Sequence, residues 1–563
     1  MITCLFGPVT TGRWDHEQSS ISQFEHSLGD FLKTTLSALS LSLLLAVGAS
    51  AQQASRTAPI EGIRDNGTGY HALVGARAVT SPGQSIDNAT IVIRNGMIQS
   101  VERGGSAPAG ARVWDLEGLT VYAGFIDSHA DLGMDQVPEG GDVGPTHWNP
   151  QVRAWFSTTA NLQDDEDRRQ ALRSQGFGTA LVVPKQGIFR GTASVVNLGD
   201  TGVRDRILRP DVAQSIGFQR SFELGGRYPN SAMGTIALMK QTFMDADWYM
   251  RAWGAYEASG RAFLPPETSA ALEALESAVQ GQQPVIFETR SEEEYLRGQI
   301  LAEDFGLDAW YRGNGQEYRI IDVLGENTEP LFVPLDFPDA PDVDNPEAAM
   351  NASLAELRHW YLAPTNAGQL ADAGIDFAIT SDGLTSVGDF LPNLRTAVAR
   401  GLSPDDALAA ITTTPARYLG IEGTHGTIAA GNVANLVVAE GDLFTQEVDV
   451  RDVWVHGTVY GVTRAAQIDP RGTWVIQSED QWGFQAQLTL EGTMNRLSGY
   501  IDVAPGANVD EGVRVEIASA SVVSETGRLE VTFDGEELGY EGTALLAGSV
   551  SGEDFYGWTS LPN

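Results

Sequence analysis

The chain has 563 residues, of which 42% are hydrophobic and 20% charged, and its formal net charge is −38 at pH 7. This composition is typical of a globular protein, and the length predicts two or three domains with a large core. The negative charge argues against nucleic acid as a partner, because binding to phosphates requires a basic surface. Cys4 is the single cysteine, which excludes an intrachain disulfide and argues against a thiolate metal site or a cysteine nucleophile.

The beginning of the chain resembles a secretory signal. An apolar run at residues 36–47 follows Lys33, and residues 49–51 (Ala-Ser-Ala) form a small-residue cleavage site. The run is short for a membrane span. We therefore expect a signal peptide with a long leader over 1–51, a polar linker over 52–69, no membrane span in the mature chain, and a periplasmic or secreted location. A buried core helix is the alternative interpretation of the run.

The remaining chain divides by its hydrophobic pattern. Residues 70–120 form short apolar strands with a turn signal at Asn95-Gly96. Residues 121–421 alternate strand-like apolar runs with helical stretches, which is typical of a parallel α/β fold. Strand-rich sequence returns over 422–467. Residues 468–563 alternate apolar and polar positions without a helical period, which predicts an antiparallel β domain.

Potential ligands stand at the ends of three predicted strands. The strand at residues 121–126 runs directly into Asp127, His129 and Asp131. The strand at 283–287 ends at Glu288, and the strand at 374–380 ends at Ser381-Asp382-Gly383, so that Asp382 follows it closely. An α/β barrel places its chemistry at the carboxyl ends of its strands.

Four motifs resemble the amidohydrolase superfamily. They are GFIDSHAD at 124–131, AITSDG at 378–383, TTTPARYLG at 412–420 and GTIAAGNVANLVV at 426–438. Within the superfamily, the loop VVPKQGIFRG at 182–191 is similar to exported, imidazolonepropionase-like members. The resemblance implies a TIM-like (β/α)8 barrel over 121–421 and a small β-sandwich built from both flanks, 70–120 and 422–467.

The resemblance also implies a site. Its members hydrolyse C–N bonds other than ordinary peptide bonds, in a small-molecule substrate such as a cyclic amide, an imide or a modified dipeptide, through a metal-activated water. His129 matches the first metal-binding histidine, and Asp382 matches the catalytic aspartate after the last strand. Asp131 and Glu288 stand where the superfamily has histidines. His129 and Asp131 are two residues apart in an extended segment, so both point to one face.

The implied metal ligands, His129, Asp131, Glu288 and Asp382, therefore comprise one imidazole and three carboxylates. Carboxylate-rich sets suit Mn²⁺, Mg²⁺ or Ca²⁺, whereas zinc favours nitrogen ligands. Zinc, manganese and iron stay open as the divalent ion, and so does a degenerate site without a metal. In that case at least one carboxylate would retain its proton, because clustered carboxylates repel one another. No histidine is apparent after the sixth strand, where Arg312 and Asn314 lie near the expected position.

Further residues are weaker candidates. Lys185 and Arg190 follow the second strand and could bind a substrate carboxylate or serve the structure of their loop, and His359 could line the site. No lysine is placed convincingly after the fourth strand. His147 and Trp148 follow an acidic, glycine-rich loop and could form part of a lid. We expect His425 and His456, which lie in the sandwich segment 422–467, to be structural.

Three function hypotheses follow. The first is a periplasmic metal-dependent amidohydrolase in which Asp382 moves the proton of the attacking water. The second is a catalytically inactive protein of the same fold that binds a ligand or pairs with a related amidohydrolase, or with a second copy of itself. The third is binding of carbohydrate or envelope material through residues 468–563.

Overall fold

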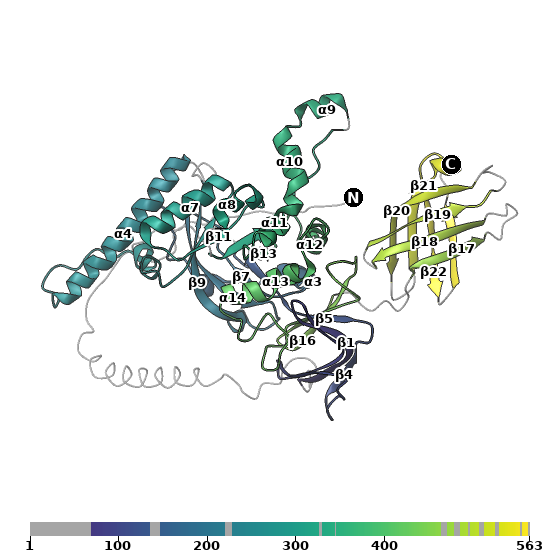
Figure 1. Ribbon diagram of the computed structural model, residues 1–563, viewed down its shortest axis with the longest axis horizontal. Helices are drawn as coiled ribbons and strands as arrows, with labels where there is room; N and C mark the ends of the chain where they lie inside the picture. Colours follow the sequence, from purple (N-terminus) through teal and green to yellow (C-terminus); the bar gives the residue numbers. More distant parts are fainter. Residues whose placement is uncertain are drawn as a thin grey trace, which may run out of the picture. The chain divides into compact units, whose positions relative to one another are not determined.

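The computed structural model of the protein forms three β-sheets with associated helices (Figure 1). The predicted signal peptide over 1–51 and nearly all of the predicted linker over 52–69 lie outside the described residues. Within the described part of the chain, none of the helices combines the length and apolar character that a membrane crossing needs. The structure describes residues 69–134, 147–219, 228–325, 329–343, 345–462, 470–477, 485–493, 496–505, 512–523, 528–551 and 554–560.

The central sheet has eight strands in the order β13-β12-β11-β10-β9-β8-β7-β6. Five of its seven strand pairings are parallel, and seven of its eight strands run in one direction. The strands are β6 (Phe125–Ala130), β7 (Phe177–Val182), β8 (Phe189–Asn197), β9 (Ile207–Gly217), β10 (Val285–Glu288), β11 (Ala309–Arg312), β12 (Leu331–Pro334) and β13 (Ala378–Thr380).

Strand β8 departs from the predicted parallel pattern, because it pairs antiparallel with both β7 and β9. Only residues 183–188 connect β7 to β8. A parallel connection needs a crossover of a dozen or more residues, so this short link forces the chain to turn back as a hairpin. The first residues of β8 therefore lie at the same edge of the sheet as the carboxyl ends of the other seven strands.

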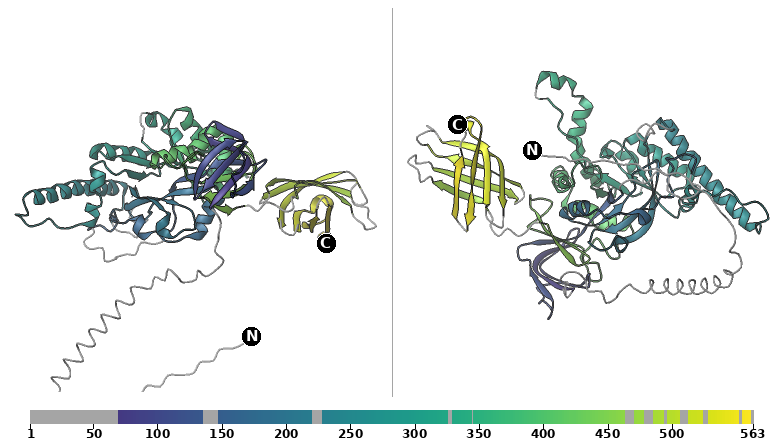
Figure 2. Two further views of the ribbon diagram at one scale, coloured as in Figure 1. Left: turned by 90° about the horizontal axis from the view of Figure 1, so that it is seen from below. Right: turned by 180° about the vertical axis from the view of Figure 1, so that it is seen from behind.

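Helices connect the parallel strands and cover the sheet (Figure 2). One of these helices begins after Ser403, whose side chain accepts from the backbone N–H of Asp406, and Pro404 is the first helical residue. The helices are α2 (Thr158–Asn161), α3 (Glu166–Ser174), α4 (Ala232–Ala258), α5 (Ala270–Glu273), α6 (Glu276–Val279), α7 (Glu292–Phe305), α8 (Ile321–Leu324), α9 (Pro346–Asn351), α10 (Leu354–Leu362), α11 (Asn366–Asp372), α12 (Phe390–Ala399), α13 (Pro404–Ile411) and α14 (Thr413–Tyr418).

Both faces of the central sheet are buried, as expected for parallel strands. In β10, Val285 and Phe287 pack in the cluster that includes the helices, whereas Ile286 packs in a second cluster with Trp310 and Phe332 of the neighbouring strands. This alternation is the period of two of a β-strand. The long apolar runs read from the sequence therefore supply two cores, one on each face.

Side chains join the two end strands of the sheet, β6 and β13. The hydroxyl of Ser128 donates to the carbonyl of Ile379 at 2.9 Å. Asp127 is fully buried, and its carboxylate accepts from the hydroxyls of Thr380 and Ser381 and from the backbone N–H of Ser381. Among the described residues no backbone ladder links these strands, so a closed barrel remains a prediction. We call these contacts of Asp127 and Ser128 with residues 379–381 the seam between β6 and β13. The seam holds His129 and Asp382 close together.

The two flanks of the central region meet in one eight-stranded sheet, ordered β16-β15-β14-β5-β1-β2-β3 with β4 beside β1. The strand β14 pairs antiparallel with β5, which joins the two flanks directly. Its strands are β1 (Tyr70–Ser81), β2 (Gln84–Arg94), β3 (Met97–Arg103), β4 (Arg112–Asp115), β5 (Thr120–Ala123), β14 (Leu436–Ala439), β15 (Val450–Val455) and β16 (Thr458–Gly461).

The predicted turn at Asn95-Gly96 is confirmed between β2 and β3. Both residues have positive φ, 51° and 79°, which is the conformation of a type I′ hairpin. A side chain at Gly96 would collide with the ring of His456, because its Cβ would lie 2.5 Å from that ring. His456 therefore packs on the hairpin, in agreement with a structural role.

The C-terminal antiparallel β domain is confirmed. Seven strands pair in sequence order, each antiparallel to the next, and one cluster of apolar side chains, which includes Leu488, Val531 and Leu546, is buried within it. The strands are β17 (Gly472–Gln477), β18 (Gln485–Thr493), β19 (Arg496–Val503), β20 (Val513–Val523), β21 (Arg528–Asp534), β22 (Thr543–Ser551) and β23 (Asp554–Ser560).

The seam between β6 and β13 should be costly to break. We expect Asp127→Ala to lower the free energy of unfolding by at least about 2 kcal/mol, because it leaves buried donors of Thr380 and Ser381 without an acceptor. Urea denaturation of the full-length chain measures the loss. Asp376→Ala is the control, since Asp376 forms an exposed ion pair with Arg417 and should change stability by less than about 1 kcal/mol. Equal effects of the two variants would contradict the seam.

Candidate functional site

The site lies at the edge of the central sheet where seven strands have their carboxyl ends. Parallel strands bring side chains that are distant in sequence together at this edge. The antiparallel strand β8 contributes from its first residues, for the reason given above. Six ionisable side chains converge there: His129 from β6, Lys185 from the loop after β7, Arg190 from the start of β8, Glu288 from the end of β10, Arg312 from the end of β11 and Asp382 after β13.

Three of the predicted ligands come together. His129 is fully buried, its Nδ1 lies 3.4 Å from Asp382 Oδ2, and its Nε2 lies 3.8 Å from Glu288 Oε2. One atom from each residue lies within 4.8 Å of the others. Asp131 is exposed and does not belong to this group of the described residues, although it follows β6 directly.

Lys185 lies at the centre of this group. Its Nζ is 2.7 Å from Asp382 Oδ1, 3.2 Å from Glu288 Oε2 and 3.4 Å from His129 Nδ1. The ammonium thus contacts all three candidate metal ligands at once. About a quarter of the Lys185 side chain is exposed, which makes it the most accessible of the six.

Two arginines complete the ion pairs. The buried guanidinium of Arg190 donates from Nη1 to Glu288 Oε2 at 2.6 Å and from Nη2 to Oε1 at 3.3 Å. Arg312 Nε lies 2.8 Å from Asp382 Oδ2, and its Nη2 donates to the carbonyl of Asp382 at 3.0 Å. With Lys185, these contacts place a cationic nitrogen against each of the four oxygens of the two carboxylates.

A glycine makes room for Arg190. Gly217 ends β9, and it pairs with Glu288 of β10 in the sheet register. A Cβ at Gly217 would collide with Nη2 of Arg190. The guanidinium therefore crosses the end of β9 to reach Glu288 only because residue 217 has no side chain.

The ionisation states follow from these contacts. Burial and the Lys185 ammonium lower the pKa of His129 to about 3, so the imidazole is neutral at pH 7. Burial raises the pKa of Glu288, but Arg190 and Lys185 outweigh burial and hold this pKa well below 4.5. Burial also raises the pKa of Asp382, whereas His129, Lys185 and Arg312 lower it to about 2. At pH 7 the centre thus holds three cations and two carboxylates.

The residues do not fit the divalent metal that the fold family typically uses. The two carboxylates already face three cations, so an added ion would enter a centre with surplus positive charge. Unit charges about 4 Å apart interact by about 4 kcal/mol at an effective dielectric constant of about 20, and a divalent ion doubles this repulsion. The guanidinium groups cannot lose their protons to relieve it. The His, Glu and Asp donors are present, but their charge is already balanced.

Other predicted residues lie outside this centre. The Nδ1 atom of His359 in α10 lies 3.2 Å from the hydroxyl of Tyr318, and the His359 ring borders a hollow with Asp339 and Glu356. His425 is buried beside Thr424, with its Nδ1 2.8 Å from the hydroxyl, and burial lowers its pKa to about 4.

The lid prediction is only partly within the described residues, because residues 135–146 lie outside them. The Nδ1 atom of His147 accepts from the backbone N–H of Asn149 at 3.1 Å. Trp148 is 66% exposed, and its ring stacks on Tyr228 with 6.3 Å between the ring centroids. The described contacts therefore give an exposed aromatic pair, and the lid stays a prediction.

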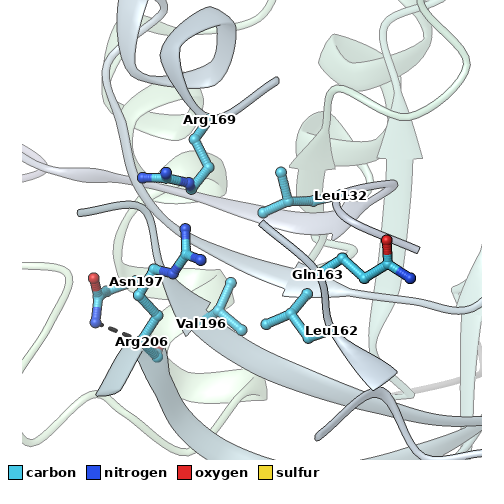
Figure 3. A pocket seen from close by; sticks show the side chains of 7 residues that line it. All are labelled: Leu132, Leu162, Gln163, Arg169, Val196, Asn197 and Arg206. Carbon is cyan, nitrogen blue, oxygen red and sulfur yellow. Dashed lines mark hydrogen bonds between the residues drawn. The ribbon is translucent and has the colours of Figure 1, made fainter. Parts of the chain in front are cut away.

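A second hollow lies beneath β8 and is also separate from the centre (Figure 3). Its wall includes Arg169 and Arg206, whose guanidinium groups both lie 2.9 Å from Asp164 Oδ1. In Figure 3 the two arginines point toward one another beside apolar side chains. Neither hollow is lined by His129, Lys185, Glu288 or Asp382.

Comparisons with known proteins agree with the described sheet. The crystal structure of an amidohydrolase from Thermotoga maritima MSB8 is similar, with a TM-score of 0.57, 21% identity, and coverage of 69% of this chain and 98% of that chain. The chain has the amidohydrolase fold. Residues 365–468, which contain Asp382, match the Amidohydrolase family model. A putative prolidase from Bifidobacterium longum aligns less well, with a TM-score of 0.43 and 18% identity over 71% of this chain and 97% of the prolidase.

A curated relative matches over a short segment. Adenine deaminase 2 from Jannaschia sp. (strain CCS1) is 35% identical over 112 residues, which is 18% of this chain and 17% of the deaminase. The chain thus aligns with less than a fifth of that relative. The fold of this amidohydrolase-like chain is established, and its reaction has to be inferred from the centre.

The sequence interpretation missed how Lys185, Arg190 and Arg312 act together. For the first two it left open a contact with a substrate carboxylate or a role in the structure of their loop, and in the structure both contact Glu288 of the chain itself. The available signal was the replacement of a histidine by Glu288 on a buried strand. A buried carboxylate requires a cationic partner, and the nearest loop cations were Lys185 and Arg190.

The pair between Arg190 and Glu288 should dominate the stability of this edge. We expect Arg190→Met to lower the free energy of unfolding by about 3–5 kcal/mol, because it leaves a buried carboxylate without its bidentate partner. Adding Glu288→Leu should restore part of the loss. Urea denaturation measures all three proteins. The control is Arg417→Met, which breaks an exposed ion pair and should cost less than about 1 kcal/mol. A double variant no more stable than Arg190→Met would contradict this assignment.

Proposed function

We propose that the chain is an exported, catalytically inactive protein of the amidohydrolase fold that acts as a binding subunit. The contacts of Lys185 carry this proposal, because its ammonium bonds to all three candidate metal ligands. Together with Arg190 and Arg312 it occupies the carboxylate oxygens that would hold the metal ion in a hydrolase of this fold.

The same contacts remove the groups that hydrolysis requires. A general base must reach the attacking water and must have a pKa near the working pH. Both carboxylate oxygens of Asp382 are held by Lys185 and Arg312. His129 is fully buried, and its Nδ1 faces Lys185. The centre is therefore suited to holding the strand ends together rather than to moving a proton.

Exposed apolar side chains support the role of a binding subunit. On α4, Met233, Met244 and Trp248 are 82%, 57% and 58% exposed, and their spacing of 11 and 4 residues places them on one helix face. Apolar side chains gathered on an exposed face mark interaction sites. Because a net charge of −38 opposes self-association, the partner that we propose is a different chain, a related amidohydrolase with its metal ligands intact.

The proposal predicts an absence of turnover. Full-length chain, assayed with cyclic amides, imides and modified dipeptides in the presence of Zn²⁺, Mn²⁺ or Fe²⁺, should hydrolyse none of them above the rate of the Asp382→Asn variant. The two proteins should share the same circular dichroism spectrum, which controls for folding. A turnover that Asp382→Asn abolishes would refute the inactive subunit.

The proposal also predicts a specific complex. Co-expression with a metal-containing amidohydrolase of the same organism should give a hetero-complex by light scattering, whereas the chain alone stays monomeric. Trp248→Glu should weaken the complex, because it places a charge on the apolar face of α4. Arg417→Glu, which reverses an exposed charge on α14, is the control. A complex that is indifferent to Trp248→Glu, or absent altogether, would argue against this surface.

A second candidate is an exported metal-dependent hydrolase of non-peptide C–N bonds. It is favoured by His129 Nε2, a buried atom without a hydrogen bond among the described residues, and by the match of residues 365–468 to the Amidohydrolase family. The small-molecule substrate would then be a cyclic amide, an imide or a modified dipeptide. The turnover assay above separates the two candidates, because this one requires Asp382-dependent hydrolysis.

A further inference from the structure

We propose that the ammonium of Lys185 takes the place of the divalent ion, so that one lysine both completes the centre and prevents metal binding. The inference concerns the same site as the proposed inactive function and rests on it. Its readouts are metal content and melting temperature rather than turnover, so either proposal can fail without the other.

The hydrogen bonds of Lys185 match those of an internal ligand. An ammonium has three N–H donors, and three acceptors lie within 3.4 Å of Nζ: Asp382 Oδ1, Glu288 Oε2 and His129 Nδ1. The acceptors come from three different strand ends of the sheet. One cation therefore links β6, β10 and the segment after β13. A metal ion bound by the same three residues would link the same elements.

The contact with Lys185 also bears on the form of His129. Its Nδ1 lies 3.4 Å from both Lys185 Nζ and Asp382 Oδ2. In the tautomer in which Nδ1 accepts from the ammonium, the proton of the neutral ring is on Nε2, and a protonated nitrogen has no lone pair for a metal. In that tautomer neither nitrogen of His129 is suited to coordination while the lysine is in place.

The loop that carries Lys185 is fixed at both ends. The backbone N–H of Val183 donates to the carbonyl of Ala130 at 3.1 Å, and that of Ile188 donates to the carbonyl of Gln151 at 2.9 Å. Val183 and Ile188 are both fully buried. The six-residue link between β7 and β8 therefore delivers the ammonium to the centre from an anchored backbone.

Arg190 and Arg312 remain when Lys185 is removed, and the surplus positive charge of the centre is lost. Without the lysine, two guanidinium groups face two carboxylates, and the centre has no surplus positive charge. His129 Nδ1, Asp382 Oδ1 and Glu288 Oε2 then lose their shared donor. These three atoms form a nitrogen and carboxylate set of the kind that Zn²⁺ or Mn²⁺ accepts. Lys185→Met should therefore create a metal site in a protein that lacks one.

The experiment compares metal content and melting temperature of the full-length wild type and Lys185→Met, purified without chelator. Wild type should carry substoichiometric metal by elemental mass spectrometry, and its melting temperature should be the same in EDTA, Zn²⁺ and Mn²⁺. Lys185→Met should melt several degrees lower in EDTA and recover with Zn²⁺ or Mn²⁺. Its affinity by calorimetry should exceed that of wild type by at least about a hundredfold, since a neighbouring cation is gone.

Two controls isolate the charge at position 185. Lys185→Arg keeps the cation and should not respond to metal. Lys240→Met removes an exposed lysine that pairs with Asp304, and it should behave as wild type. If Lys185→Met does not fold, Lys185→Gln also removes the cation and takes its place in the same measurements. The metal content of the wild type tests the inference independently of any variant. One tight equivalent of metal in wild type, with a melting temperature that falls in EDTA, overturns the inference. So does a folded Lys185 variant that gains no response to metal.

Discussion

The edge of the central sheet depends on balancing the charge of two carboxylates that the fold withdraws from water. Glu288 and Asp382 stand at strand ends because parallel strands terminate there, and His129 beside them is neutral and offers no charge. Burying an unpaired carboxylate costs several kcal/mol. The chain meets this requirement with Lys185, Arg190 and Arg312, each of which contacts one or both carboxylates. The positions of these cations in turn determine what chemistry the edge can support.

The reversed strand β8 is part of this solution. In a regular alternation of strands and helices, the residues after β7 would leave the edge through a helix. Here residues 183–188 turn directly into β8, so Lys185 in the link and Arg190 at the start of the strand both stay at the edge. Gly217 at the end of β9 then leaves space for the guanidinium. The hairpin and the distant glycine together allow the two cations to reach Glu288.

Much of the fold could be predicted because its signals are local. The hairpin at Asn95-Gly96 and the alternating pattern of the C-terminal strands are both present in the structure, and the motif around His129 lies at a strand end as expected. The direction of β8 could not be read from hydrophobicity, since a buried strand has the same composition in either direction; only the length of its connection reveals it. For the site, the convergence of His129, Glu288 and Asp382 was predictable from strand ends. The pairing of their charges was not, because it depends on side chains that the sheet order brings together.

A metal ion and a lysine satisfy the same geometric requirement with different consequences. Both can link an imidazole and two carboxylates across neighbouring strands. The ion leaves a coordination position for water and lowers the pKa of that water, whereas the ammonium uses its three donors on the protein and offers no such position. Replacing the expected histidines with Glu288 and Arg312 adds one negative and one positive charge in fixed places, which favours the internal cation over the ion. If Lys185 replaces the ion as we propose, the chain retains the strand-end architecture of the amidohydrolase fold because it supplies the positive charge itself.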